Sequence, residues 1–335
     1  MRYVEVGGLR LSAVGLGTWQ FGSKDWGYGE GYATEVAPAI VRRALELGIN
    51  FFDTAEAYAW GRSERILGAA LADRRSEAFI ATKLLPVLPL SPIVQRRARS
   101  SAERLGIESI DLYQMHWPNP AVPIANTMSA FSQLLDSGLI RHAGVSNFSL
   151  ERWRKAEGAL GRPVLSNQVR LSLLYRRAER ELLPWAQAND RLVIAYSPLA
   201  QGLLSGRFRP GEKATGTRAR TPAFQEENVR RARPLLDALQ QVAEAHGCTS
   251  AQVALAWLIR RPNVLVIPGA SSVAQLEANA EAADLSLSDE EDAALVEAAD
   301  AYTPLAGREL VSTMTRAQID HLGGRLKKVS DGLKG

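Results

Sequence analysis

Short apolar runs alternate with longer amphipathic segments along most of the chain. The apolar runs predict eight strands, and the segments between them repeat apolar residues with the spacing of helices. Strands and helices that alternate in this way are typical of the α/β class and of its closed (β/α)8 form, the TIM barrel. The expected strands span residues 14–16, 50–52, 78–82, 110–115, 140–145, 164–169, 192–196 and 264–267, and the expected helices span 35–47, 63–72, 92–104, 124–137, 150–159, 178–188, 226–246 and 273–283.

The start of the chain has a different pattern. Residues 3–6 and 9–12 are two short strand-like runs separated by Gly7 and Gly8, which predicts a β-hairpin that plugs the bottom of the barrel. No proline-rich or serine-rich linker follows, so residues 1–335 are expected to form a single barrel domain. Residues 301–335 are expected to form a C-terminal tail, with helical character, near the active site.

Three of the expected strands end in polar side chains that can carry out proton chemistry. Asp53 and Tyr58 follow one strand, Lys83 ends the next, and His116 ends the third. Because the carboxyl ends of barrel strands meet at one rim, these four side chains are expected to lie close together. A phenol beside an ammonium, a carboxylate and an imidazole is a combination suited to proton transfer.

Each of these residues also has an ordinary structural interpretation. Asp53 alone can cap a helix, and Tyr58 alone can be a half-buried aromatic residue. Lys83 alone can be a surface lysine, and His116, between Met115 and Trp117, can be a core histidine. Their joint occurrence at three successive strand ends favours the functional interpretation.

Composition narrows the class of protein. The net charge of the 335 residues is only +4, and basic residues are not interleaved with aromatic ones, so no nucleic-acid partner is expected. The single cysteine, Cys248, excludes intrachain disulfides and suits a reducing compartment. No signal-like segment or apolar run of about 20 residues occurs, so a cytoplasmic location without a membrane partner is expected. The four scattered histidines predict no metal site.

Several segments together resemble the aldo-keto reductase family. They are residues 52–58, 81–83, 114–118, 144–148, 167–168, 196–206 and 267–270, in the family's order. The resemblance covers roughly residues 1–300 and implies a (β/α)8 barrel that binds a nicotinamide cofactor across its C-terminal rim. It also implies an oxidoreductase that acts on a small-molecule aldehyde, ketone or sugar carbonyl. Glu64 and Gly68 match the family as well, and there anchoring of the second helix and close packing are expected.

The resemblance implies that Asp53, Tyr58, Lys83 and His116 form a catalytic tetrad. Tyr58 would give up the proton, but a free tyrosine has a pKa near about 10, which is too high for an efficient proton shuttle. The ammonium of Lys83, held by Asp53, would favour the phenolate and lower that pKa. His116 would orient the substrate carbonyl through a hydrogen bond.

The resemblance also implies the residues that contact cofactor and substrate. The expected cofactor contacts are Thr18, Trp19, Asp53, Ser146, Asn147, Gln168, Tyr196, Ser197, Leu199, Gln201, Gly202, Leu204, Ile267, Gly269, Ser271, Gln275 and Asn279. Ser146, Asn147 and Gln168 would bind the carboxamide, and Tyr196 would stack on the nicotinamide ring. The expected substrate contacts are Trp19, Trp26, Tyr58, Trp60, His116 and Trp117.

The adenosine end departs from the family pattern. Gln275 stands where an arginine is common, and no lysine or arginine lies between Pro268 and Asn279. We expect NADPH as cofactor, with NADH possible, and Arg218 or Arg220 can supply charge from the loop. Two alternatives stay open: a cofactor-binding regulatory subunit, such as the potassium-channel β subunits, and a dehydrogenase that works mainly by alcohol or sugar oxidation.

Overall fold

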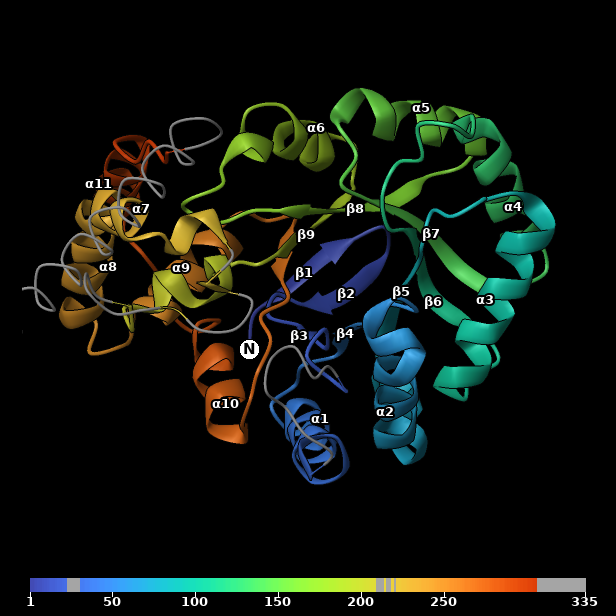
Figure 1. Ribbon diagram of the computed structural model, residues 1–335, viewed down its shortest axis with the longest axis horizontal. Coiled ribbons are helices and arrows are strands. Elements are labelled where there is room, and N and C mark those ends of the chain that lie inside the picture. Colours follow the sequence, from blue (N-terminus) through green and yellow to red (C-terminus); the bar gives the residue numbers. More distant parts are fainter. Residues whose placement is uncertain (23–30, 209–213, 215–217, 220, 306–335) are drawn as a thin grey trace, which may run out of the picture.

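The computed structural model describes residues 1–22, 31–208, 214, 218, 219 and 221–305 (Figure 1). Its main sheet has eight parallel strands, each hydrogen-bonded to the next along the chain. Gly15 N donates to Val266 O (2.8 Å) and Val266 N donates to Ala13 O (2.9 Å), so the first and last strands also join. The predicted (β/α)8 barrel is therefore confirmed, with strands β3 (Leu16–Gly17), β4 (Phe51–Asp53), β5 (Phe79–Leu84), β6 (Ile110–Met115), β7 (Ile140–Ser146), β8 (Val164–Arg170), β9 (Leu192–Tyr196) and β10 (Val264–Val266).

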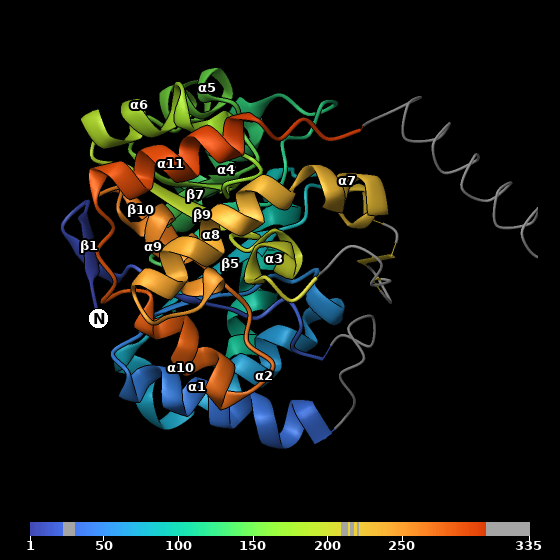
Figure 2. The same ribbon diagram turned by 90° about the vertical axis from the view of Figure 1, so that its left-hand side faces the viewer.

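The predicted hairpin covers one end of the barrel. It consists of β1 (Tyr3–Val6) and β2 (Leu9–Ser12), joined by Gly7 and Gly8 in left-handed conformations. Gly7 N donates to the carboxylate of Asp190, and Asn50 N donates to Ser12 Oγ. Asn50 and Asp190 precede β4 and β9, so the hairpin lies against the amino ends of the strands. In Figure 2 the hairpin occupies the left-hand end of the molecule and α7 (Glu226–Arg231) the right-hand end.

Helices surround the barrel, and most lie where the sequence predicts them. One helix before each strand from β4 to β10, and the first helix after β10, surround the barrel: α1 (Ala37–Glu46), α2 (Arg62–Leu71), α3 (Ser91–Leu105), α4 (Ile124–Asp136), α5 (Leu150–Leu160), α6 (Leu182–Ala188), α9 (Ser250–Ile259) and α10 (Val273–Glu281). Short 3-10 or π-helical elements span Tyr32–Val36, Tyr58–Gly61, Ala72–Glu77, Arg177–Glu179, Ala200–Ser205 and Pro222–Phe224. None of the described helices is both long enough and apolar enough to cross a membrane.

The seventh expected helix is helical in the structure, but it is divided in two and does not directly precede β10. The segment 226–246 forms two helices, α7 and α8 (Arg233–Ala245), with Pro234 in the first turn of α8. The helix before β10 is instead α9, which is apolar on every side and has eight of its ten residues buried. Such a helix lacks the amphipathic period used for prediction. It is buried because α8 packs over it.

One more helix was not among those expected. It is α11 (Asp289–Asp300), which also packs on α8. Its N-terminus carries a capping box in which Ser288 and Glu291 bond reciprocally to each other's backbone N–H.

Two helix contacts expected from the sequence are confirmed. The buried carboxylate of Glu64 in α2 accepts hydrogen bonds from Thr82 Oγ1 (2.6 Å) and Arg104 Nε (2.5 Å). A side-chain carbon added at Gly68 would clash with the backbone carbonyl of Leu105. Glu64 therefore anchors α2 to β5 and α3, and Gly68 allows α2 to approach the end of α3 closely.

Candidate active site

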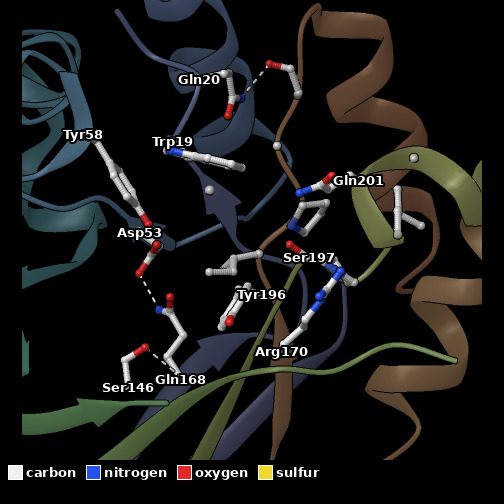
Figure 3. A pocket seen from close by; sticks show the side chains of 18 of the residues that line it. Trp19, Gln20, Asp53, Tyr58, Ser146, Gln168, Arg170, Tyr196, Ser197 and Gln201 are labelled. Carbon is white, nitrogen blue, oxygen red and sulfur yellow. Dashed lines mark hydrogen bonds between the residues drawn. The ribbon is translucent and has the colours of Figure 1, made fainter. Parts of the chain in front are cut away.

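A cleft of about 460 Å³ opens at the carboxyl ends of the barrel strands (Figure 3). Its lining comes from segments spread along the whole barrel, which shows how the fold gathers distant parts of the sequence. The lining residues are Gly17, Trp19, Gln20, Asp53, Tyr58, His116, Trp117, Ser146, Asn147, Gln168, Arg170, Tyr196, Ser197, Pro198, Leu199, Gln201, Gly202, Arg218, Ile267, Pro268, Gly269, Ala270, Ser271 and Gln275.

Lys83 connects a carboxylate to a phenol at the floor of the cleft. Its Nζ donates to Asp53 Oδ1 (2.7 Å) and to the carbonyl oxygen of Thr54 (2.8 Å). It also lies 3.2 Å from Tyr58 Oη. The Lys83 side chain is fully buried and that of Asp53 is 2% exposed. A charged lysine so far from water is stable only beside an opposite charge and with its donors satisfied.

Burial and charge act in opposite directions on these groups. Burial raises the pKa of Tyr58, while the Lys83 ammonium acts in the lowering direction without overcoming it. Burial by itself lowers the pKa of Lys83, but the Asp53 carboxylate and the phenol prevail and hold that pKa above its ordinary value. Burial raises the pKa of Asp53, against the opposing effects of Lys83 and Gln168. The sequence-based expectation that Lys83 brings the pKa of Tyr58 below its free value is therefore not met in the protein alone.

His116 is held neutral beside these groups. Burial, together with the nearby Lys83 charge, lowers the pKa of His116 to about 2. Its ring stacks on Trp117, with centroids 3.7 Å apart, and meets Tyr58 edge to face at 5.9 Å. Among the described residues its buried Nδ1 has no hydrogen-bond partner. His116 therefore presents a neutral imidazole to the cleft.

A group of polar side chains adjoins this cluster on β7, β8 and β9. Gln168 Nε2 donates to Asp53 Oδ2 (2.7 Å), and Ser146 Oγ donates to the Gln168 backbone carbonyl (2.9 Å). Asn147, in a left-handed conformation with φ of 62°, donates to His116 O (3.1 Å) and accepts from Tyr196 Oη (2.8 Å). Asparagine tolerates this conformation better than most non-glycine residues, and residues held in it often occur at functional sites.

The far end of the cleft, beside α10, carries no charge of its own. Gln275 Oε1 accepts hydrogen bonds from Ser271 N (2.7 Å) and Ser271 Oγ (2.8 Å). The lining residues here are Gly269, Ala270, Ser271 and Gln275, so no described lysine or arginine lines this end. A side-chain carbon at Gly269 would lie 2.8 Å from Gln20, so any larger residue would disturb this wall.

The cleft gathers most, but not all, of the residues expected from the sequence. Thr18 is buried and bonds to Asp53 O, and Asn279 donates to Gly269 O, so both lie behind the wall. Leu204 is fully buried and does not line the cleft, and Lys83 lies beneath its floor. The Trp60 side chain is 92% exposed and also does not line it, whereas Trp19 and Trp117 do. Trp26, Arg220 and residues 306–335 lie outside the described residues.

Six lining residues were missed by the sequence analysis. They are Gly17, Gln20, Arg170, Pro198, Pro268 and Ala270. A signal was available for Arg170, which stands two positions after Gln168 and therefore projects from the same face of β8. Gly17 is needed for close approach, because a side-chain carbon there would lie 2.7 Å from Ile267 O.

Comparison with known proteins agrees with the barrel fold. The sequence model of the Aldo/keto reductase family matches residues 13–300. The chain belongs to the aldo-keto reductase family. An uncharacterised oxidoreductase of Mycobacterium tuberculosis is 52% identical to this aldo-keto reductase over 320 residues, which cover 95% of this chain and 99% of the relative.

Two solved aldo-keto reductase-like structures share the architecture. A glycerol dehydrogenase from Gluconobacter oxydans superposes with a TM-score of 0.83 at 30% identity, covering 91% of this chain and 97% of that one. An aldo/keto reductase from Klebsiella pneumoniae, solved with NADP and acetate, has a TM-score of 0.72 at 32% identity, with coverage of 91% and 96%.

Proposed function

We propose that this aldo-keto reductase transfers hydride reversibly between NADPH and an aldehyde, ketone or sugar carbonyl, with Tyr58 as the general acid. The observation that carries the proposal is the contact of the Tyr58 phenol with the buried Lys83–Asp53 pair inside the cleft. A structural tyrosine has no need of a buried ion pair beneath its hydroxyl.

Tyr58 is suited to give up a proton during carbonyl reduction. Its pKa lies above the ordinary value, so the phenol is protonated at neutral pH and ready to donate. The phenolate that forms after donation would be stabilised by the Lys83 ammonium 3.2 Å away. In the opposite direction the phenol must first lose its proton, so alcohol or sugar oxidation is expected to be favoured only at higher pH.

His116 would orient the substrate. A neutral imidazole has one N–H donor and one acceptor nitrogen. Because the pKa of His116 is about 2, the ring stays neutral in the working pH range. A buried N–H without an acceptor is costly, which favours the proton on Nε2 rather than on the partnerless Nδ1. The Nε2–H would then donate to the carbonyl oxygen and hold it beside Tyr58.

The cleft residues fit a nicotinamide cofactor, which when bound supplies the hydride. Ser146, Asn147 and Gln168 offer hydroxyl and amide groups for the carboxamide, and Tyr196 offers an aromatic face for the ring. Gln168 already donates its Nε2 to Asp53, which leaves its carbonyl oxygen to accept from the carboxamide. The segment Ser197–Gly202 would line the diphosphate and Ser271–Gln275 the adenosine end.

NADPH is the expected cofactor, with a smaller margin over NADH than in relatives that carry an arginine at this position. The side chain of Gln275 is engaged with Ser271 and offers no charge to a 2′-phosphate. Hydrogen bonds from serine and backbone N–H groups at a helix start still suit an anion.

A cofactor-oxidation assay over a panel of aldehydes, ketones and sugars tests the proposal. The parent protein is expected to oxidise NADPH with at least one carbonyl, and Tyr58→Phe is expected to lose that turnover while retaining cofactor binding. A protein that binds NADPH tightly but turns over no carbonyl and no alcohol would instead be a regulatory subunit of the family.

A further inference from the structure

The charges that line the cleft are distributed unevenly. Asp53 is the one acidic residue among the lining residues that the structure describes, and it is paired with Lys83. The cationic lining residues are Arg170 and Arg218. Arg170 makes no ion pair within 4.0 Å among the described residues. Among the described residues, the part of the cleft near Arg170 therefore carries a positive charge that no carboxylate pairs with.

Arg170 lies beside the segment that leaves β9. Its Cα pairs with that of Tyr196 in the β8–β9 register, and Ser197 comes directly after. In Figure 3 its side chain extends toward Ser197, on the opposite side of the cleft from Tyr58. The guanidinium carbon sits 3.4 Å from the centroid of the Tyr175 ring. This stacking holds the planar group in place while its N–H donors remain available at the edges.

Arg218 approaches the same segment from the long loop after β9. Its Nε donates to the carbonyl oxygen of Gln201 at 2.8 Å. Between the two arginines the backbone is held in left-handed conformations at Ser197, Ala200 and Gln201, which are not glycines. Conformational strain of this kind persists where the surroundings fix the chain for a function.

We infer that Arg170 binds the diphosphate of the nicotinamide cofactor, together with Arg218, over the segment Ser197–Gly202. This inference rests on the proposed function. A diphosphate carries two negative charges, and guanidinium groups bind phosphate oxygens through charge-assisted, often bidentate hydrogen bonds. The opposite end of the cleft, at Ser271–Gln275, has no described cation for a 2′-phosphate. The charged contacts therefore recognise the part that NADPH and NADH have in common.

Binding of cofactor fragments to variants tests this inference without any turnover. ADP-ribose contains the diphosphate but no nicotinamide, so a disturbance of the ring-stacking face of Tyr196 cannot change its affinity. Adenosine 2′-phosphate contains the 2′-phosphate but no diphosphate. The variants are Arg170→Gln and Arg218→Gln, and the matched control is Arg177→Gln, which removes the same charge from an exposed position outside the cleft.

We expect Arg170→Gln to weaken the binding of ADP-ribose, NADPH and NADH by a similar factor of about 10 or more. This is the loss expected when a charged hydrogen bond is removed. Adenosine 2′-phosphate should bind as it does to the parent, and Arg177→Gln should change none of the four affinities. Arg170→Lys, which keeps the charge but loses the planar fork, should give an intermediate loss. Thermal unfolding of each variant checks that the fold is intact, and Arg170→Lys serves if Arg170→Gln does not fold.

Two results would overturn the inference. One is an unchanged affinity for ADP-ribose with a raised KM for a carbonyl that carries a carboxylate, which would make Arg170 a substrate-binding residue. The other is a loss confined to NADPH and adenosine 2′-phosphate, which would assign Arg170 to the 2′-phosphate. A parent protein that binds no ADP-ribose at all would contradict the proposed function itself, and so the two failures are distinguishable.

Discussion

The side-chain amide of Gln168 donates a 2.7 Å hydrogen bond to Oδ2 of Asp53, the carboxylate oxygen that Lys83 does not contact. Both side chains are buried, so no bulk water competes for that oxygen. The Asp53 carboxylate is therefore satisfied from two strands at once, by Lys83 on β5 and by Gln168 on β8. A residue expected to contact the cofactor is thus linked through Asp53 and Lys83 to the Tyr58 phenol.

Replacement of Gln168 tests this link. Gln168→Leu leaves one oxygen of a buried carboxylate without a donor, and we expect a loss of about 1.5–3 kcal/mol in the free energy of unfolding. Gln168→Glu places a second carboxyl group beside Asp53, and like charges raise the pKa of such a pair. When the pKa of a carboxyl group is higher in the folded than in the unfolded state, the folded protein becomes less stable as the pH rises above the pKa of the unfolded state. Chemical denaturation at several pH values should therefore show a pH-dependent deficit for Gln168→Glu that Gln168→Leu lacks.

Loss of the proton donor is the most direct test of the chemistry. Tyr58→Phe removes the hydroxyl beside Lys83 but keeps the aromatic ring that meets His116 edge to face. We expect carbonyl reduction to fall by about 10²- to 10⁴-fold, as is usual for removal of a general acid. The NADPH dissociation constant, measured by fluorescence titration, should change little. Turnover near the parent rate would exclude Tyr58 as the donor.

Lys83 should control the pH dependence of the oxidation direction. The pKa of Tyr58 is already raised by burial, and Lys83 is the group that acts against this rise. Lys83→Met removes that opposition, so the pKa of Tyr58 rises further and the phenolate needed for oxidation forms only at higher pH. The pH profile of kcat/KM for alcohol oxidation should therefore shift upward, with the largest loss at neutral pH. An unshifted profile with preserved turnover would remove Lys83 from the mechanism.

The sequence predicts the barrel and the strand-end residues well because both follow from short-range patterns. Each of Asp53, Lys83 and His116 ends or follows a short apolar run that is typical of a buried strand, and parallel strands bring their ends to one rim. The pattern fails where burial comes from elements added outside the barrel. Helix α9 is apolar on all sides because α8 covers it, so its sequence carries no amphipathic period.

The sequence pattern also does not predict which way the side chains of loop residues point. Trp60 lies only two residues after Tyr58, yet both Ala59 and Trp60 adopt left-handed conformations that turn the chain. The Trp60 side chain consequently faces solvent and not the cleft. Arg170 could have been predicted from the alternation of β8, but its importance depends on the charges contributed by other strands.

The engagement of Gln275 with Ser271 bears on the choice between NADPH and NADH. Gln275 Oε1 accepts from both the backbone N–H and the hydroxyl of Ser271. Those two donors would otherwise be available to a 2′-phosphate at the start of α10. The glutamine therefore adds no positive charge and also competes for the donors that remain.

Gln275→Arg should reverse both effects. The guanidinium cannot accept a hydrogen bond, so Ser271 is released, and its planar donors can bind a 2′-phosphate bidentately. A charged hydrogen bond contributes about 1.5–3 kcal/mol, which corresponds to about 10- to 150-fold in affinity. We expect the ratio of the NADH and NADPH dissociation constants to increase by that factor at fixed ionic strength, while Gln275→Leu, which only releases Ser271, produces a much smaller increase. A parent protein that already prefers NADPH by more than about a thousandfold would exceed the contribution of one charged hydrogen bond, so another group would have to bind the 2′-phosphate. A parent protein that prefers NADH would overturn the expected cofactor.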